Sequence, residues 1–218
     1  MKLVSVNIGQ VRQVVHQGRT LTTGIFKEPV AGRVRLRRLG IEGDEQADRA
    51  VHGGVDKAVY CYPHEHYDYW QGDYWQGQLG RDDFAPGQFG ENLTLSGLTE
   101  DQVLIGDVYR IGTARLQVSQ PRTPCLKLNI RMNDPTFSKP FLQSLRVGFY
   151  VRVLEEGTVA AGDPIERIER DETSLSVSEV CRLLHLEHDD RDAMRRAANL
   201  PKLTLEWRNS LLERMETQ

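Results

Sequence analysis

The chain has 218 residues, of which 39% are hydrophobic and 27% charged, and its formal net charge is −3. This length suffices for one large domain, or for one medium domain with a small appendage. The weak negative charge argues against nucleic-acid or membrane partners that bind through bulk electrostatics. Neither a membrane-spanning apolar stretch nor a secretory signal is visible, so the sequence predicts a cytoplasmic protein.

Short strand patterns, separated by turn residues, dominate residues 1–170. They predict strands, in chain order, at 3–8, 24–30, 32–37, 58–62, 108–111, 114–118 and 148–154. Short helices are expected after Pro63, at 126–132 and at 137–145. Many short strands with regular turns favour a closed β-barrel over an open α/β sheet.

The pattern changes near Asp171, where helical spacing begins. Ser176 and Glu179 have the spacing of a capping box, and the apolar residues after them predict a helix with Cys181 in its core. Two more helices are predicted, one over 190–199 and one after Pro201. The expected fold is therefore mainly β with helices (α+β), with a β-barrel domain over 1–170 and a small three-helix bundle over 171–218. The bundle would cap the barrel, or dock an electron donor or a second subunit in a homodimer.

The three cysteines, Cys61, Cys125 and Cys181, lie far apart in the sequence. Their odd number and wide spacing argue against a disulfide framework and against a zinc site made of cysteine pairs. Three thiols also cannot supply the four ligands of an iron–sulfur cluster, and no nucleotide-binding glycine motif occurs. A redox reaction at this chain would therefore draw its electrons from another protein.

Cys125 follows a stiff and basic turn. Pro121 and Pro124 disfavour a helix before it, so a helix can begin just after it. This position, together with Arg122 and Lys127, favours the thiolate form of Cys125. A thiolate is a nucleophile or a ligand for a soft metal, whereas the alternative is a buried structural cysteine.

Two glycine-bearing polar segments, 52–57 and 87–92, add further candidates. Paired glycines let backbone N–H groups approach a phosphate, for which Lys57 and Arg122 supply counter-charges. Asn92 offers a donor and an acceptor to the edge of a heterocycle. Together with Cys125, these segments predict an anionic, heterocyclic cofactor bound beside a thiolate.

Two other chemistries use the histidines of this region. A zinc site at His64 and His66 is disfavoured, because residues two apart do not share a helix face. A cysteine hydrolase that pairs Cys125 with His52 stays open, although no third group that would orient the histidine is evident.

Three strings, at 42–60, 87–93 and 120–128, resemble the MOSC family (molybdenum cofactor sulfurase C-terminal domain), and more narrowly its YiiM-type bacterial members. The resemblance implies a barrel of the pyruvate-kinase type, a molybdenum cofactor (molybdopterin), and reduction of N-hydroxylated compounds such as hydroxylamino base analogues. It makes Cys125 the molybdenum ligand. The expected cofactor-binding residues are His52, Gly53, Lys57, Gly90, Glu91, Asn92, Arg122 and Lys127.

The implied reaction also needs a proton donor and an electron source. Glu91 and His52 are the candidates for the proton donor, and the sequence does not choose between them. The electrons would come from a separate flavin or iron–sulfur reductase. The alternatives are a sulfur carrier with a persulfide on Cys125 and the cysteine hydrolase.

Overall fold

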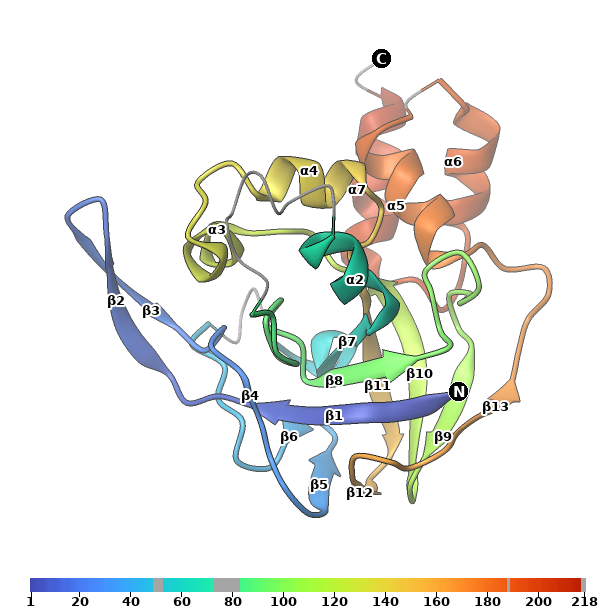
Figure 1. The fold of residues 1–218 in the computed structure, drawn as a ribbon. Coiled ribbons are helices and arrows are strands. Elements are labelled where there is room, and N and C mark those ends of the chain that lie inside the picture. Colours follow the sequence, from blue (N-terminus) through green and yellow to red (C-terminus); the bar gives the residue numbers. More distant parts are fainter. Residues whose placement is uncertain (49–52, 73–82, 188, 217–218) are drawn as a thin grey trace.

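The computed structural model describes residues 1–48, 53–72, 83–187 and 189–216. An eight-stranded mixed sheet forms the centre of the molecule (Figure 1). Neighbouring strands are antiparallel except β7 and β8, which are parallel. In spatial order the strands are β13 (Ile165–Glu169), β9 (Val108–Ile111), β10 (Ala114–Pro121), β11 (Phe149–Glu155), β7 (Val59–Pro63), β8 (Leu93–Ser96), β1 (Lys2–Ile8) and β4 (Glu28–Pro29).

The sheet curls until its far edge approaches β1. Leu3 N donates to Asp163 O over 2.9 Å, and Gly162 N donates to Leu3 O over 2.8 Å. These bonds and one isolated bridge take the place of a ladder between β1 and β13. The closed barrel expected from the sequence is therefore not found. The physical reason is that β4 pairs with the C-terminal end of β1, so only the first residues of β1 meet the chain around residue 163.

Two small sheets flank the large one. One contains β5 (Val34–Arg37), β6 (Gly40–Ile41) and β12 (Gly157–Val159). The other is a hairpin of β2 (Arg12–His16) and β3 (Arg19–Thr23), which projects from the body of the molecule (Figure 1). The sequence patterns did not predict this hairpin. It turns at Gln17 and Gly18, both with positive φ (50° and 73°), but Gln-Gly is not among the strong hairpin signatures.

In the described residues, four short helical segments lie between the strands of the large sheet in sequence: the 3₁₀ turn η1 (Val55–Lys57), α2 (Glu65–Gln71), α3 (Leu126–Met132) and α4 (Ser138–Gln143). The helices α2, α3 and α4 gather on one side of the sheet (Figure 1). An aromatic core lies beneath them, with Trp70, Phe89 and Phe141 all fully buried. This core supports the segments that carry the candidate site.

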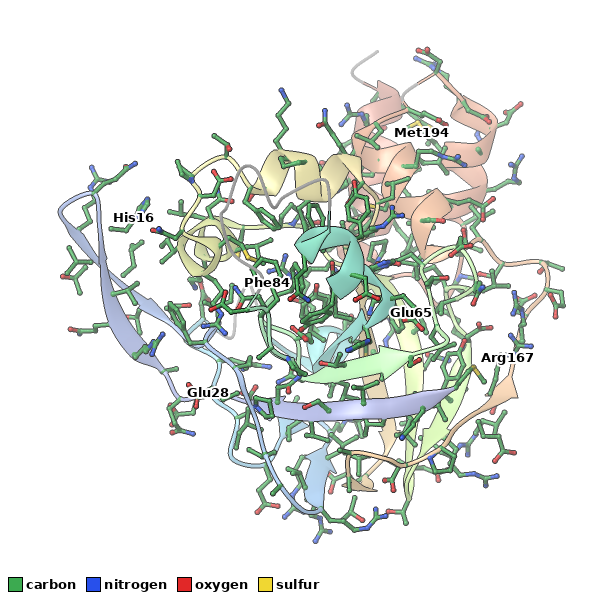
Figure 2. All side chains as sticks on the ribbon, viewed as in Figure 1. His16, Glu28, Glu65, Phe84, Arg167 and Met194 are labelled. Atoms are coloured by element: carbon green, nitrogen blue, oxygen red, sulfur yellow. The ribbon has the colours of Figure 1, made fainter. Side chains whose placement is uncertain are left out.

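The C-terminal segment forms three helices, α5 (Val177–His185), α6 (Arg191–Ala198) and α7 (Leu205–Glu216). The capping box of Ser176 and Glu179 is present at the start of α5, as predicted. Met194 of α6 points into the interior (Figure 2) and belongs to the same core as the strands. Backbone bonds such as Val177 N to Val103 O (2.9 Å) also join the segment to the chain between β8 and β9. The helices thus pack as part of the main body.

Two of the three cysteines are core residues, and the helical spacing had predicted this for Cys181. Cys61 in β7 is 1% exposed and Cys181 in α5 is fully buried. Among the described residues, no helix has the length and apolarity to cross a membrane.

Candidate functional site

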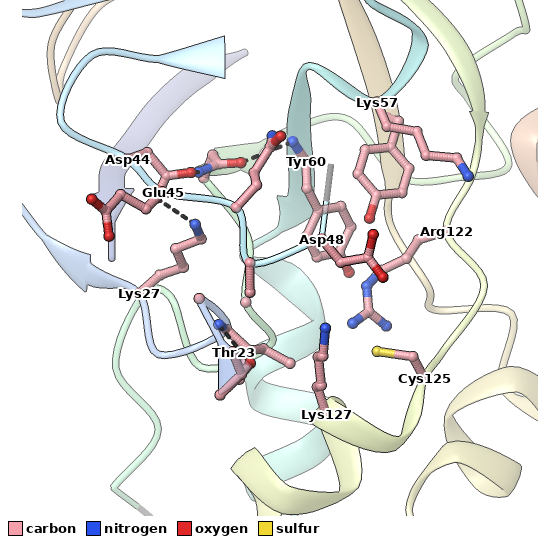
Figure 3. Close-up of a pocket in the computed structure, with 17 residues that line it drawn as sticks. Thr23, Lys27, Asp44, Glu45, Asp48, Lys57, Tyr60, Arg122, Cys125 and Lys127 are labelled. Atoms are coloured by element: carbon pink, nitrogen blue, oxygen red, sulfur yellow. Dashed lines mark hydrogen bonds and ion pairs between the residues drawn. The ribbon is translucent and has the colours of Figure 1, made fainter. Parts of the chain in front are cut away.

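A pocket lies where the chain after β3, the loop before η1 and the turn between β10 and α3 meet (Figure 3). It brings together residues that are distant in sequence, and both cationic and acidic side chains face it. The residues lining it are Thr23, Gly24, Ile25, Lys27, Asp44, Glu45, Gln46, Ala47, Asp48, Lys57, Tyr60, Gly90, Asn92, Arg122, Cys125, Lys127 and Tyr150.

Cys125 is the residue before α3, and its thiol is free and partly exposed. Its backbone is extended (φ −132°, ψ 166°), and α3 begins at Leu126, as the proline pattern predicted. The sulfur lies close to the guanidinium of Arg122 in Figure 3. Cys125 is therefore a pocket residue and not the buried structural cysteine of the alternative interpretation.

Arg122 is a buried cation with an unused donor. It is 5% exposed, and its guanidinium lies 5.0 Å from the ring centre of Tyr60 and 5.6 Å from that of Phe141. Burial opposes the charge, but the nearby Tyr60 and Cys125 raise the pKa of Arg122 overall. Its Nη1 has no hydrogen-bond partner among the described residues. Because an unpaired buried donor on a charged group is costly, this geometry suits an anionic ligand.

Two lysines add positive charge to the same pocket. Lys127 lies in the first turn of α3, and Lys57 ends η1. The Nζ of Lys57 is 2.5 Å from Oε2 of Glu206 in α7. Of the residues predicted for cofactor or metal binding, six line this pocket: Lys57, Gly90, Asn92, Arg122, Cys125 and Lys127.

A buried ion pair forms the opposite wall, and the sequence patterns gave no sign of it. The ammonium of Lys27 pairs with the carboxylate of Asp44, and the two side chains are 6% and 4% exposed. Burial lowers the pKa of Lys27, while Asp44 acts in the opposite direction. Asp44 also accepts from Gly9 N (2.8 Å) and from Asn92 Nδ2 (3.0 Å). The pair therefore fixes the segment 44–48 against β1 and β8.

Asn92 lines the pocket, but its side-chain amide is engaged within the protein. Its Oδ1 accepts from Tyr60 N over 3.2 Å, and its Nδ2 donates to Asn7 O (3.3 Å) as well as to Asp44. This geometry indicates a role in holding the wall, and it leaves little of the amide to read a heterocycle edge.

Glu91 does not line the pocket. It is fully buried, and its carboxylate accepts from Gly87 N (2.7 Å), Phe89 N (3.1 Å), Thr94 Oγ1 (2.8 Å) and the hydroxyl of Tyr67. Burial raises its pKa, and these donors oppose the shift. The four donors favour a role in shaping the 87–91 loop over the proton-donor role expected from the sequence.

The glycines of this loop serve the packing of the wall. Gly87 and Gly90 have φ of 90° and 81°, in the left-handed region that favours glycine. A Cβ at Gly90 would lie 2.6 Å from Cγ1 of Ile25. Gly90 thus lets the loop approach the segment after β3.

The expected roles of His52 and Gly53 are not tested. His52 lies outside the described residues, and Gly53 is described but does not line the pocket. His64 stacks on Tyr67 with ring centres 5.4 Å apart, whereas His66 pairs with buried Glu100 over 2.6 Å. In the described part of the chain, no cluster of three or more His, Cys, Asp or Glu side chains could hold a metal ion.

Sequence reasoning missed several pocket residues besides Lys27 and Asp44. Asp48 and Tyr150 also face the cavity, and Figure 3 shows the Asp48 carboxylate on the side of Arg122. Asp44 and Asp48 both lie in the string 42–60, which carries part of the family resemblance, and that resemblance could have marked them as candidates.

Comparison with known proteins defines the class. The MOSC domain model matches residues 48–166, and the model of the YiiM-like, 3-alpha helix domain matches residues 175–218. The chain belongs to the MOSC family.

Within that family its similarity to YiiM-type proteins is nearly full-length. It is 39% identical to YflK of Bacillus subtilis over 98% of this chain and 94% of the relative, and 37% identical to YiiM of Escherichia coli over 97% and 91%. The crystal structure of YiiM from Geobacillus stearothermophilus matches with a TM-score of 0.81 at 38% identity, covering 98% of each chain. A protein of Gibberella moniliformis named "Reductase" is 32% identical over 93% of this chain, but the match spans 36% of that protein.

Proposed function

We propose that the chain is a molybdenum-cofactor-dependent reductase of N-hydroxylated compounds. The observation that carries this proposal is that one pocket contains the buried Arg122 Nη1, which has no hydrogen-bond partner in the described ranges, and the partly exposed thiol of Cys125. The guanidinium of Arg122 suits an anionic group and the thiol of Cys125 suits a soft metal. A molybdenum cofactor has both, a phosphate at one end and the metal at the other.

The residues present fit such a group. Cys125 Sγ would be the protein ligand of molybdenum, and Arg122, Lys57 and Lys127 would neutralise the phosphate. When bound, the cofactor supplies a centre that accepts the oxygen atom of an N–OH group. The overall reaction converts N–OH to N–H with two electrons and two protons and releases water.

The chain's own residues position the substrate and supply protons. We propose Asp48 as a proton donor because its carboxylate faces the pocket, with His52 kept as the candidate from the sequence. The buried Lys27–Asp44 pair would hold the segment that carries Asp48. The electrons would come from a separate flavin or iron–sulfur reductase, since the chain's three cysteines cannot hold an iron–sulfur cluster.

Two measurements test the proposal. Protein purified from a host that makes the pterin should contain molybdenum and pterin near one equivalent each. Reduction of a hydroxylamino base analogue should require an added reductase and should not proceed with NADPH alone. Bound sulfane sulfur without molybdenum would instead support the persulfide carrier. Ester or amide hydrolysis without metal would support the hydrolase, although no described histidine lines the pocket.

A further inference from the structure

The projecting hairpin of β2 and β3 has one cationic face and one neutral face (Figure 1). In an antiparallel pair, directly opposite residues lie on the same face, and so do residues two apart in one strand. The register therefore defines one face, here called the basic face, by the opposite pairs Arg12 and Thr23, Val14 and Leu21, and His16 and Arg19. The other face carries the uncharged residues Gln13, Val15, Thr20 and Thr22.

The arginines of the basic face are exposed, and their charge is not balanced nearby. Within the described residues neither Arg12 nor Arg19 forms an ion pair, and the guanidinium of Arg12 lies 3.4 Å from the ring centre of Phe26. No Asp or Glu occurs in residues 10–27, although the whole chain has 31 acidic residues and a net charge of −3. The hairpin is thus a positive arm on a negatively charged chain, and it suits a partner surface rich in carboxylates.

The basic face leads directly to the pocket. Thr23, which ends β3, lines the pocket together with Cys125, and Arg12 lies opposite Thr23 in the ladder. Arg19 begins β3, so at roughly 3.3 Å per residue the basic face extends about 13 Å from the pocket wall. A protein bound along this face would therefore lie beside the pocket.

We propose that the basic face docks the electron donor, and that the donor is an acidic flavin or iron–sulfur protein. The inference rests on the proposed function, which takes its electrons from a separate protein. The half-buried Val14 and Leu21 give the face an apolar centre between its two arginines, as is common in protein interfaces. The start of α6 suits an acidic donor less well, because Asp189, Asp190 and Asp192 are exposed there.

The experiment is calorimetric titration of an acidic plant-type [2Fe–2S] ferredoxin, in its oxidised form, into the full-length protein at low salt. Arg12→Gln/Arg19→Gln should raise the Kd about 4- to 25-fold, since each exposed ion pair contributes about two- to fivefold. Arg19→Glu should also raise the Kd, and it keeps the contact of Arg12 with Phe26. The matched control, Arg195→Gln/Arg196→Gln, removes two exposed charges from α6 and should leave the Kd unchanged.

Three results contradict the inference. The first is an unchanged Kd in both hairpin variants, which includes the case in which no ferredoxin binds. The second is a larger loss in the α6 variant, which would assign docking to the C-terminal helices. The third is a change in the sedimentation of the free protein in the hairpin variants, which would assign the basic face to a second copy of this chain.

Failure of the proposed function is distinguishable, because the titration measures docking without turnover. Reduced methyl viologen is a small electron donor that needs no docking surface. If the proposed function holds, viologen should drive reduction of a hydroxylamino base analogue equally well in the unmodified chain and in the hairpin variants. If the proposed function fails, that reduction is absent from all of them, whereas the ferredoxin titrations still test the basic face.

Discussion

Arg122 and Cys125, three residues apart, line the same pocket from the turn between β10 and α3. The guanidinium is buried with one nitrogen unpartnered within the described residues, and the thiol beside it is partly exposed. This arrangement is costly without a ligand, because a buried charged donor is left without a hydrogen bond.

Arg122→Met should separate ligand binding from stability. Replacing an unpaired buried charge with an apolar side chain should leave the midpoint of thermal unfolding of the cofactor-free protein unchanged or higher. The same change should reduce cofactor retention by about 10- to 100-fold, as expected for loss of a charged hydrogen bond. Calorimetric unfolding and molybdenum analysis measure the two effects. A large drop in stability with unchanged molybdenum content would assign Arg122 to the core instead.

Asp44→Asn should destabilise the protein by about 3–5 kcal/mol, because it leaves the buried ammonium of Lys27 without its counter-charge. Denaturant unfolding of the cofactor-free protein measures the loss. The double variant Lys27→Met/Asp44→Asn should recover most of that stability, since no buried charge then remains unpaired. Equal stability of the single and double variants would show that the pair is not coupled.

Thiol reactivity should single out Cys125. Burial raises the pKa of Cys181 to about 12, and burial also raises the pKa of Cys61. At pH 8 the thiolate fraction of Cys181 should be about 10⁻⁴, so alkylation of the native protein should label Cys125 alone. Mass spectrometry of the labelled peptides checks this, with denatured protein as the control in which all three cysteines react. Labelling of Cys61 or Cys181 in the native state would contradict the described burial.

The raised pKa of Cys181 should also make the free energy of unfolding depend on pH in alkaline solution. The pKa of Cys181 rises from 9.0, the ordinary value expected in the unfolded chain, to about 12 in the folded protein. Between these values the Cys181 thiol binds fewer protons in the unfolded chain than in the folded protein. Its contribution to the free energy of unfolding is therefore present below pH 9 and is lost as the pH rises toward 12. Cys181→Ala should flatten the decline of the unfolding free energy over that range. An unchanged slope would show that the Cys181 thiol does not titrate differently in the two states.

Replacing Glu91 and replacing Asp48 should affect different properties of the protein, which are stability for Glu91 and turnover for Asp48. Glu91→Gln puts an amide among four donors and should cost about 1–3 kcal/mol of stability. Asp48→Asn should lower kcat by about 100-fold or more, if Asp48 donates a proton in the reaction. Steady-state kinetics and thermal unfolding of both variants decide the matter. A stable Glu91→Gln with abolished turnover would return the proton-donor role to Glu91.

Local signals were sufficient for part of the fold and of the site. The proline pattern predicted that a helix starts right after Cys125, and the spacing of Ser176 and Glu179 predicted the capping box of α5. Both the helix start and the capping box depend only on residues that are close together in the sequence. The hairpin at 12–23 was missed because Gln-Gly is a weak turn signal. How far the large sheet closes could not be predicted, because strand pairing at the edge of β1 depends on distant segments.

The remaining features depend on contacts that no local pattern encodes. The carboxylate of Glu91 accepts a hydrogen bond from Tyr67, which lies 24 residues earlier, so its buried position involves a contact that the neighbouring glycines do not reveal. The Lys57–Glu206 pair joins residues 149 positions apart. Charge and spacing indicated which residues were candidates, whereas tertiary packing decided which of them face the pocket.

The central claim is that the sulfur of Cys125 binds molybdenum, and metal analysis of the Cys125→Ser variant tests it most directly. The variant should be expressed in a host that makes the pterin and compared with Cys181→Ala, which removes a buried thiol that does not line the pocket. We predict near-stoichiometric molybdenum and turnover in Cys181→Ala, and loss of both in a folded Cys125→Ser. Full molybdenum content and activity in Cys125→Ser would contradict the account.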